Sequence, residues 1–362
     1  MLLTNDFGRY LFVSKENFQD ILSLKIEKKS DIYRNLIDAK MIYDESDLEY
    51  SSMNKYLLRE IKGHVNMATS LHIFVVTTRC NMGCVYCQAN NGSEMPHLVM
   101  DKEMAEKAVD IALQSPEQSL CFEFQGGEPL INFDIIKHIV EYTELHKLEH
   151  IISYTVVTNL TLLNDEILDF LACHNFGIST SIDGNELVHN NNRPYIDGRG
   201  TYEKVVESVG RIRASGLHVG AIETTTRYSL DYSKEIVNAY VDMGFDSIFI
   251  RPLTPLGKAA KYWNEIGYTT EEFIEFYGRS LDELLVINKN GRFIKEDHAT
   301  ILLRRIRGDF MNYMELRSPC GAGVGQLAYY ADGNIFTCDE GRMLHEMGQS
   351  TFKLGNVYKS TY

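Results

Sequence analysis

Residues 72–87 read HIFVVTTRCNMGCVYC, a β-rich apolar run followed at once by three cysteines. The run His72–Thr78 predicts a buried strand, and Cys80, Cys84 and Cys87 follow it with the spacing C-x3-C-x2-C. Three thiolates on one loop can hold three irons of a [4Fe–4S] cluster and leave the fourth iron without a protein ligand. A structural zinc site is the alternative, but zinc usually takes C-x2-C pairs and needs a fourth ligand. We therefore expect a cluster whose open iron binds a small chelating ligand.

Outward from this loop, β-rich runs alternate with segments of helical periodicity, a pattern typical of βα units on a parallel sheet. Six units predict a (β/α)6 partial TIM barrel over residues 71–260, with the working groups at the carboxyl ends of the strands. An open doubly wound sheet is the competing layout, which periodicity does not exclude. We expect strands near His72–Thr78, Leu120–Phe124, Ser153–Thr158, Gly177–Ile182, Leu217–Thr225 and Ser247–Arg251. We expect helices near Asp101–Gln114, Phe133–His146, Asn164–Cys173, Tyr202–Ser215 and Ser229–Met243, with Asp101 as an N-cap.

The segments on either side of the barrel have other patterns. Residues 1–70 predict a small α+β appendage, with a strand near Tyr10–Val13 and two short helices. Residues 261–362 predict two helical stretches and then a β-hairpin, in which Ala328–Tyr330 and Asn334–Thr337 flank the turn residues Asp332-Gly333. We expect this hairpin to fold over the open end of the barrel, because it carries apolar surface to bury.

Composition excludes several classes of function. The 362 residues contain 36 Lys and Arg against 50 Asp and Glu, a net charge of −14, so we expect no nucleic-acid or membrane partner. No apolar run approaches the roughly 18 residues of a membrane span, and Asp6 interrupts the N-terminal stretch where a secretion signal would be apolar. The odd count of seven cysteines is not typical of a disulfide framework. These features predict a cytoplasmic protein.

The cysteine loop and the segments that follow it resemble the radical S-adenosylmethionine (radical SAM) superfamily. The resemblance rests on the three cysteines with Tyr86 before the last of them, and on Gly126-Gly127-Glu128-Pro129-Leu130 after the second strand. It continues in Thr158-Asn159, in Ser181-Ile-Asp183-Gly184, and in Arg193 with Gly200-Thr201-Tyr202. In that family the open iron chelates the amino and carboxylate groups of SAM, and an electron from the cluster cleaves SAM to a 5′-deoxyadenosyl radical.

The resemblance implies a role for each of these residues. Gly126 and Gly127 would let the backbone approach SAM closely, and Glu128 would accept hydrogen bonds from its ammonium group. The remaining implied contacts are Tyr86 with the adenine, Ser181 with the ribose or carboxylate, and Arg193 with the carboxylate. Each assignment has a structural alternative: a tight turn for the motif that starts at Gly126, loop packing for Tyr86, and a surface position for Arg193.

The C-terminal segment resembles the opening of a SPASM or twitch extension, in which an auxiliary Fe–S site begins. Cys320, Gly333 and Cys338 have the spacing of that motif, so both cysteines are candidate ligands. The sequence has no cysteine after Cys338, and two thiolates do not complete a four-cysteine cluster. The site is therefore truncated, partial or lost, with two reduced thiols as the alternative. We expect the SAM-binding cluster alone.

Such extensions occur in enzymes that modify ribosomal peptides or protein side chains, and the nearest resemblance is to maturases of His-Xaa-Ser systems. The resemblance implies a radical SAM enzyme that abstracts a hydrogen atom from a peptide or protein, leading to a crosslink or an oxidation. It also implies an electron donor such as flavodoxin or ferredoxin, and residues 1–70 as a winged-helix-like element that binds the precursor peptide. A radical SAM enzyme for a small metabolite and a non-catalytic Fe–S scaffold that binds a peptide are the alternatives.

Overall fold

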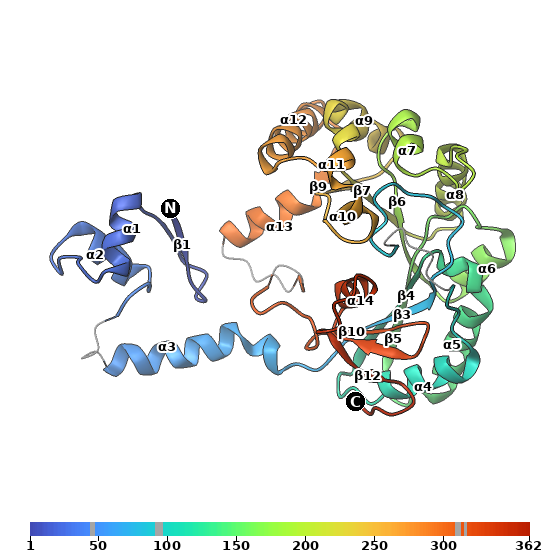
Figure 1. Ribbon diagram of the computed structural model, residues 1–362, viewed down its shortest axis with the longest axis horizontal. Coiled ribbons are helices and arrows are strands. Elements are labelled where there is room, and N and C mark those ends of the chain that lie inside the picture. Colours follow the sequence, from blue (N-terminus) through green and yellow to red (C-terminus); the bar gives the residue numbers. More distant parts are fainter. Residues whose placement is uncertain (44–47, 91–96, 308–312, 315–316) are drawn as a thin grey trace. The chain divides into compact units, whose positions relative to one another are not determined.

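The computed structural model describes residues 1–43, 48–90, 97–307, 313–314 and 317–362. Two compact units emerge (Figure 1). The smaller combines Met1–Met67 with Arg304–Cys320, and the larger combines Ala68–Leu303 with Gly321–Tyr362. The C-terminal hairpin therefore belongs to the same unit as the predicted barrel.

Six parallel strands form the centre of the larger unit. They are β3 (Leu71–Thr77), β4 (Ser119–Gly126), β5 (Ile151–Val157), β6 (Gly177–Ser181), β7 (Val219–Thr224) and β8 (Ser247–Arg251). Their order in the sheet follows their order in the chain, and each pairs in parallel with the next. A doubly wound sheet would reverse this order at a switch point. The prediction of a (β/α)6 partial barrel is confirmed.

Helices surround the outside of these strands (Figure 1). They are α4 (Lys102–Ala112), α5 (Phe133–His146), α6 (Asp165–Cys173), α7 (Glu186–Asn192), α8 (Tyr202–Ala214), α9 (Ser233–Asp242), α10 (Lys258–Lys261), α11 (Trp263–Ile266), α12 (Thr270–Lys289) and α13 (Asp297–Ile306). Asp101 caps α4 as predicted, because its Oδ1 accepts a hydrogen bond of 2.8 Å from the backbone N–H of Met104. The two-residue strand β9 (Lys295–Glu296) adds to the sheet beside β8.

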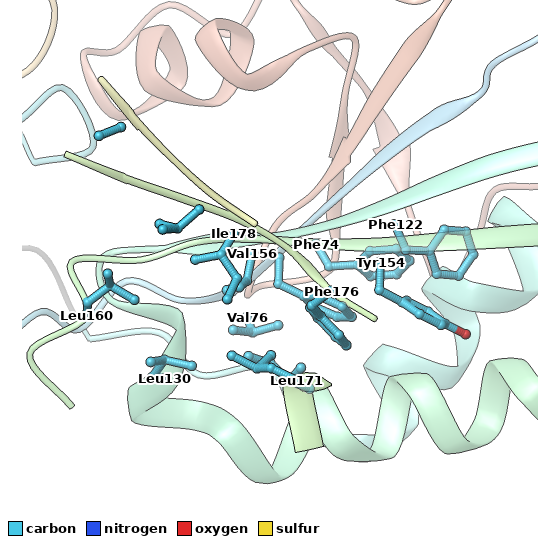
Figure 2. Close-up of a cluster of buried hydrophobic side chains, with 14 of the residues drawn as sticks. Phe74, Val76, Phe122, Leu130, Tyr154, Val156, Leu160, Leu171, Phe176 and Ile178 are labelled. Carbon is cyan, nitrogen blue, oxygen red and sulfur yellow. The ribbon is translucent and has the colours of Figure 1, made fainter. Parts of the chain in front are cut away.

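The main core lies between the sheet and these helices. Figure 2 shows Phe74, Phe122 and Tyr154 of three neighbouring strands and Phe176, which precedes β6, packed with Leu171 of α6. The Phe74 and Phe122 ring centroids lie 4.9 Å apart, and those of Tyr154 and Phe176 lie 5.5 Å apart. Alternate strand residues are thus used for packing, which leaves the others, with the loops at the strand ends, for a site.

The C-terminal hairpin forms as predicted but in a different place. Strand β10 (Gln326–Tyr329) pairs antiparallel with β11 (Asn334–Phe336), which is followed by α14 (Asp339–Glu346) and β12 (Lys353–Asn356). Strand β10 also pairs in parallel with β3, so the hairpin extends the sheet at that edge. The expectation that it covers the open end of the barrel is wrong, because its apolar side chains pack partly against β3 and partly in the main core instead.

The smaller unit begins with a two-stranded antiparallel sheet. Its elements are β1 (Leu2–Thr4), β2 (Tyr10–Phe12), α1 (Lys15–Leu22), α2 (Asp31–Asp38) and α3 (Leu48–Ile61). The side chain of Asn5 fixes the hairpin to the end of α2 by donating to the carbonyl oxygens of Ala39 and Lys40, each at 2.9 Å. No helix in the described ranges combines the length and apolar character that crossing a membrane requires.

Candidate functional site

The cysteine loop begins directly after β3, at the carboxyl end of the sheet. Its backbone is held on two sides: Gly83 and Val85 donate to the carbonyl oxygens of Pro194 and Asn192 at 2.8 and 2.9 Å, and Lys258 donates to Cys87 at 2.9 Å. Segments after β6 and β8 therefore fix the loop that carries the three thiols. All three thiols are free and half-buried.

Burial raises the pKa of the Cys80 thiol to about 12 and that of the Cys84 thiol to about 11. Metal ligation requires the thiolate, and iron supplies the positive charge that stabilises it. Within the described ranges, no three His, Cys, Asp or Glu side chains are grouped to hold one metal ion. A [4Fe–4S] cluster does not need such a group, since each thiolate binds a different iron. The three thiols, spread along one fixed loop, fit a cluster of this kind.

Gly126 and Gly127 lie against the chain that leads into the cysteine loop. A Cβ on Gly126 would lie 2.5 Å from the carbonyl oxygen of Thr77, and one on Gly127 would lie 2.3 Å from that of Arg79. The N–H of Gly127 donates to Thr77 and that of Glu128 donates to Arg79, each at 2.8 Å. Both glycines are thus required by the approach of two backbone segments. A contact of either glycine with SAM stays a prediction.

Glu128 is fully buried and already has three hydrogen-bond donors. Its Oε1 accepts from the backbone N–H of Leu130 at 3.0 Å and from the hydroxyl of Thr158 at 2.6 Å, and its Oε2 accepts from the N–H of Asn159 at 2.7 Å. Burial raises the pKa of this carboxyl, although the three donors act in the opposite direction. The side chain of Asn159 donates to Asn81 at 3.0 Å and lies 3.9 Å from the sulfur of Cys80. Glu128 therefore connects the ends of β4 and β5 beside the first cysteine.

Tyr86, Asp183 and Arg193 meet in one buried network. The hydroxyl of Tyr86 donates to Asp183, 2.8 Å from its Oδ2, and accepts from Nη1 of Arg193 at 2.7 Å. Burial raises the pKa of Asp183 to about 6, and Arg193 opposes this rise. The Arg193 guanidinium also acts on the Cys84 thiol, whose pKa it lowers against the effect of burial. The Nε of Arg193 has no hydrogen-bond partner within the described ranges, and it is buried.

A further layer of side chains holds Arg193 in place. The hydroxyl of Thr201 donates to the carbonyl oxygen of Arg193 at 2.6 Å and contacts Nε2 of His189 at 3.1 Å. Ser181, the last residue of β6, is half-buried, and no hydrogen bond of its side chain is found in the described part of the chain. Sequence reasoning left Asp183 between a turn and a site residue, and it gave His189 no role. A signal for Asp183 was present, because a carboxylate directly after a barrel strand lies at the functional end.

Cys320 and Cys338 belong to different units of the structure. Cys320 is exposed in the smaller unit, whereas Cys338 is buried in the larger one. Cys338 is the N-cap of α14, where its sulfur accepts a hydrogen bond of 3.3 Å from the N–H of Gly341. Burial raises the pKa of this thiol to about 11. A capping role explains Cys338 without iron, and an auxiliary site at these two cysteines stays a prediction.

Comparison with known proteins agrees with this geometry. The sequence profile of the radical SAM superfamily matches residues 74–230, which contain the cysteine loop, Glu128 and Arg193. This part of the chain has the sequence of a radical SAM domain. A [4Fe–4S] cluster and SAM are the cofactors of this family of enzymes, and the thiol loop with the buried arginine beside it fits both.

Two curated relatives and one solved structure are similar to this chain. An uncharacterized protein of Methanocaldococcus jannaschii, MJ0907, is 32% identical over 186 residues, which are 51% of this chain and 63% of that protein. The serine-type anaerobic sulfatase-maturating enzyme of Bacteroides thetaiotaomicron is 24% identical over 81% of this chain and 74% of its own length. The structure of native anSMEcpe with bound AdoMet and the Kp18Cys peptide has a TM-score of 0.68 at 22% identity, covering 81% of this chain and 79% of that one. This chain thus spans less than two thirds of the length of MJ0907.

The buried carboxyl of Asp183 predicts how stability changes with pH in the cluster-free protein. Its pKa of about 6 lies above the ordinary 3.8, so the folded state keeps a proton that the unfolded state has released. The free energy of unfolding therefore falls as pH rises through this window, by about 3 kcal/mol if the shift is fully expressed. We expect urea unfolding between about pH 4 and about pH 7 to show a steeper fall in the wild type than in Asp183→Asn, which keeps the other buried carboxyls with raised pKa, Glu128 and Glu223. Parallel curves for the two proteins would contradict the assignment.

Proposed function

We propose that this radical SAM protein modifies a ribosomal peptide or a protein side chain by abstracting a hydrogen atom, giving a crosslink or an oxidation. When bound, the cluster supplies the electron that cleaves SAM to the 5′-deoxyadenosyl radical. The observation that carries the proposal is the buried Tyr86–Asp183–Arg193 network beside the cysteine loop, which holds a fixed cation, and to this cation we assign the carboxylate of SAM. The relationship to sulfatase-maturating enzymes supports a protein or peptide as the substrate.

The chain's own residues have defined tasks in this proposal. Cys80, Cys84 and Cys87 hold three irons, and Arg193, oriented through the hydroxyl of Tyr86 by Asp183, pairs with a carboxylate. The Nε of Arg193, buried without a partner within the described ranges, is available to that ligand. We assign Ser181 to the same ligand because it ends the strand that precedes Asp183. We infer that the enzyme works in the cytoplasm, where thiols stay reduced, with flavodoxin or ferredoxin as electron donor.

The β1–β2 hairpin supports a peptide substrate. Within the described part of the chain these two strands pair only with each other, so their outer edges can accept a further strand. Leu2 pairs with Phe12 and Thr4 with Tyr10, and the apolar members of this face are exposed. An apolar face beside an open strand edge suits an extended peptide with alternating apolar residues. We propose that residues 1–70 bind the precursor peptide in this way.

The decisive experiment combines the reconstituted protein, SAM, a one-electron reductant and the short precursor encoded nearest to this gene. We expect 5′-deoxyadenosine by chromatography, and a peptide that has lost hydrogen atoms by mass spectrometry. The same precursor without its leader is the matched control and should react poorly. Turnover that ignores the peptide and responds to a small metabolite would replace the proposal with the metabolite enzyme. A complete absence of 5′-deoxyadenosine from cluster-loaded protein would leave the non-catalytic scaffold.

A further inference from the structure

Helix α14 connects three parts of the larger unit at the carboxyl ends of the strands. Glu346 accepts a hydrogen bond of 2.8 Å from the hydroxyl of Tyr330, just after β10. At the same end of the helix, the sulfur of the C-cap residue Met347 lies 3.4 Å from the backbone nitrogen of Gly257, in the loop after β8. One turn closer to the N-terminus of the helix, Arg342 donates to Oε1 of Gln125, near the end of β4, at 3.2 Å. The helix thus reaches both sides of the cysteine loop.

Arg342 carries a positive charge into the protein interior. It is 2% exposed, and its Nε donates to Oδ1 of Asp339 at 2.7 Å. Burial alone lowers the pKa of the guanidinium, but Asp339, Tyr330 and the thiol of Cys87 more than offset this and raise it. An arginine stays protonated in any case. The charge is therefore permanent and buried, it is paired with the carboxylate of Asp339, and it lies at the end of β4, from which the chain continues to Gly126 and Gly127 beside the cysteine loop.

The contacts of Arg342 also reach the loop through the backbone. Gln125 accepts from Arg342 and donates to Glu123 at 2.7 Å, so the orientation of its amide is fixed. The next residues, Gly126 and Gly127, lie against the chain that enters the cysteine loop. On the other side, the residue after Gly257 donates to the carbonyl oxygen of Cys87 at 2.9 Å. Helix α14 therefore contacts two segments, one at Gln125 and one at Gly257, whose following residues contact the chain at the first and the last cysteine.

We propose that Arg342 is a positioning residue whose fixed charge favours the reduced state of the cluster. The inference rests on the proposed function, since it needs a [4Fe–4S] cluster on Cys80, Cys84 and Cys87. Reduction adds one electron from an external one-electron donor and makes the cluster more negative. A buried cation stabilises that extra charge, and it does so more strongly in a low-dielectric interior than in water. Helix α14 thereby sets how easily the cluster accepts the electron that SAM cleavage requires.

Three substitutions separate charge from packing. Arg342→Lys keeps a positive charge, Arg342→Gln keeps a donor toward Gln125 without charge, and Arg342→Met keeps only volume. Arg211→Met is the matched control, because Arg211 is three-quarters buried on α8 and pairs with Asp165. The measurement is the midpoint potential of the cluster, from redox titration followed by electron paramagnetic resonance, with iron content determined for every sample.

We expect the midpoint potential to become more negative in Arg342→Gln and Arg342→Met and to stay near the wild-type value in Arg342→Lys and Arg211→Met. Wild-type potentials in cluster-loaded Arg342→Gln would overturn the proposal, as would equal shifts in the Lys and Gln variants. If Arg342→Met fails to fold, Lys and Gln still decide between the two outcomes. A wild type that binds no cluster would instead contradict the proposed function, and iron analysis reports this before any titration.

Discussion

Replacing Cys80, Cys84 and Cys87 together by alanine is expected to abolish both iron binding and 5′-deoxyadenosine formation. The three thiols lie on one loop that β3 and two other segments hold in place, and elsewhere in the described residues no three His, Cys, Asp or Glu side chains are grouped to hold a metal ion. The anaerobically reconstituted wild type should contain about four irons per chain and show broad thiolate-to-iron absorption in the visible range. The triple variant should show neither. Zinc at full occupancy with no iron in the wild type would show that the cluster assignment is wrong.

The same measurement tests the auxiliary site. Cys338 accepts a hydrogen bond as the N-cap of α14, and Cys320 and Cys338 supply only two thiols where a four-cysteine cluster needs four, so we expect no second cluster in this chain. Cys338→Ser is the matched control, because a serine hydroxyl can cap the helix in the same position. Its iron content should equal that of the wild type. About eight irons per wild-type chain, with roughly half of them left in the triple variant, would show that a complete auxiliary cluster forms.

Much of the barrel was accessible from the sequence because its elements follow local rules. Strand and helix periodicity depend on neighbouring residues, and the predicted Phe133–His146 and Ser247–Arg251 coincide with α5 and β8. The three cysteines and Glu128 were found for the same reason, since each stands in a short motif directly after a strand. The position of the C-terminal hairpin was not accessible, because pairing of β10 with β3 depends on which sheet edge remains open.

The parts of the site that the sequence missed depend on distant partners. Tyr86 and Asp183 are separated by 97 positions, and Gln125 and Arg342 by 217. A lone arginine on a C-terminal helix carries no local signal of burial beside a cysteine. Gly126 and Gly127 show a different limit. A glycine pair in a sequence indicates that the backbone comes close to something else, but not whether this is another backbone segment or a ligand. In this protein the structure shows a close approach of two backbone segments, between Gly127 and Arg79.

Replacing Glu128 by alanine is expected to lower the free energy of unfolding by about 3 kcal/mol or more. The substitution leaves three donors without an acceptor, namely the N–H groups of Leu130 and Asn159 and the hydroxyl of Thr158. Each buried donor that loses its partner costs about 1–3 kcal/mol. Glu166→Ala is the matched control, because Glu166 is an exposed glutamate paired with Lys137, and its loss should cost less than about 1 kcal/mol. Urea unfolding of the cluster-free proteins measures both values.

The family resemblance assigned Glu128 to the ammonium group of SAM, and replacing a residue with that role alone would leave the cluster intact. The structure changes that expectation, because Glu128 holds Asn159, and Asn159 in turn contacts Cys80. We therefore expect Glu128→Gln, which keeps the size of the side chain, to reduce iron loading as well as SAM affinity. A loss of SAM affinity of about tenfold to a hundredfold, with full iron content and unchanged stability, would return Glu128 to a direct SAM ligand. If calorimetry shows an unchanged affinity for SAM in a cluster-loaded variant, Glu128 has no role in SAM binding. If the variant has the same free energy of unfolding as the wild type, Glu128 has no positioning role.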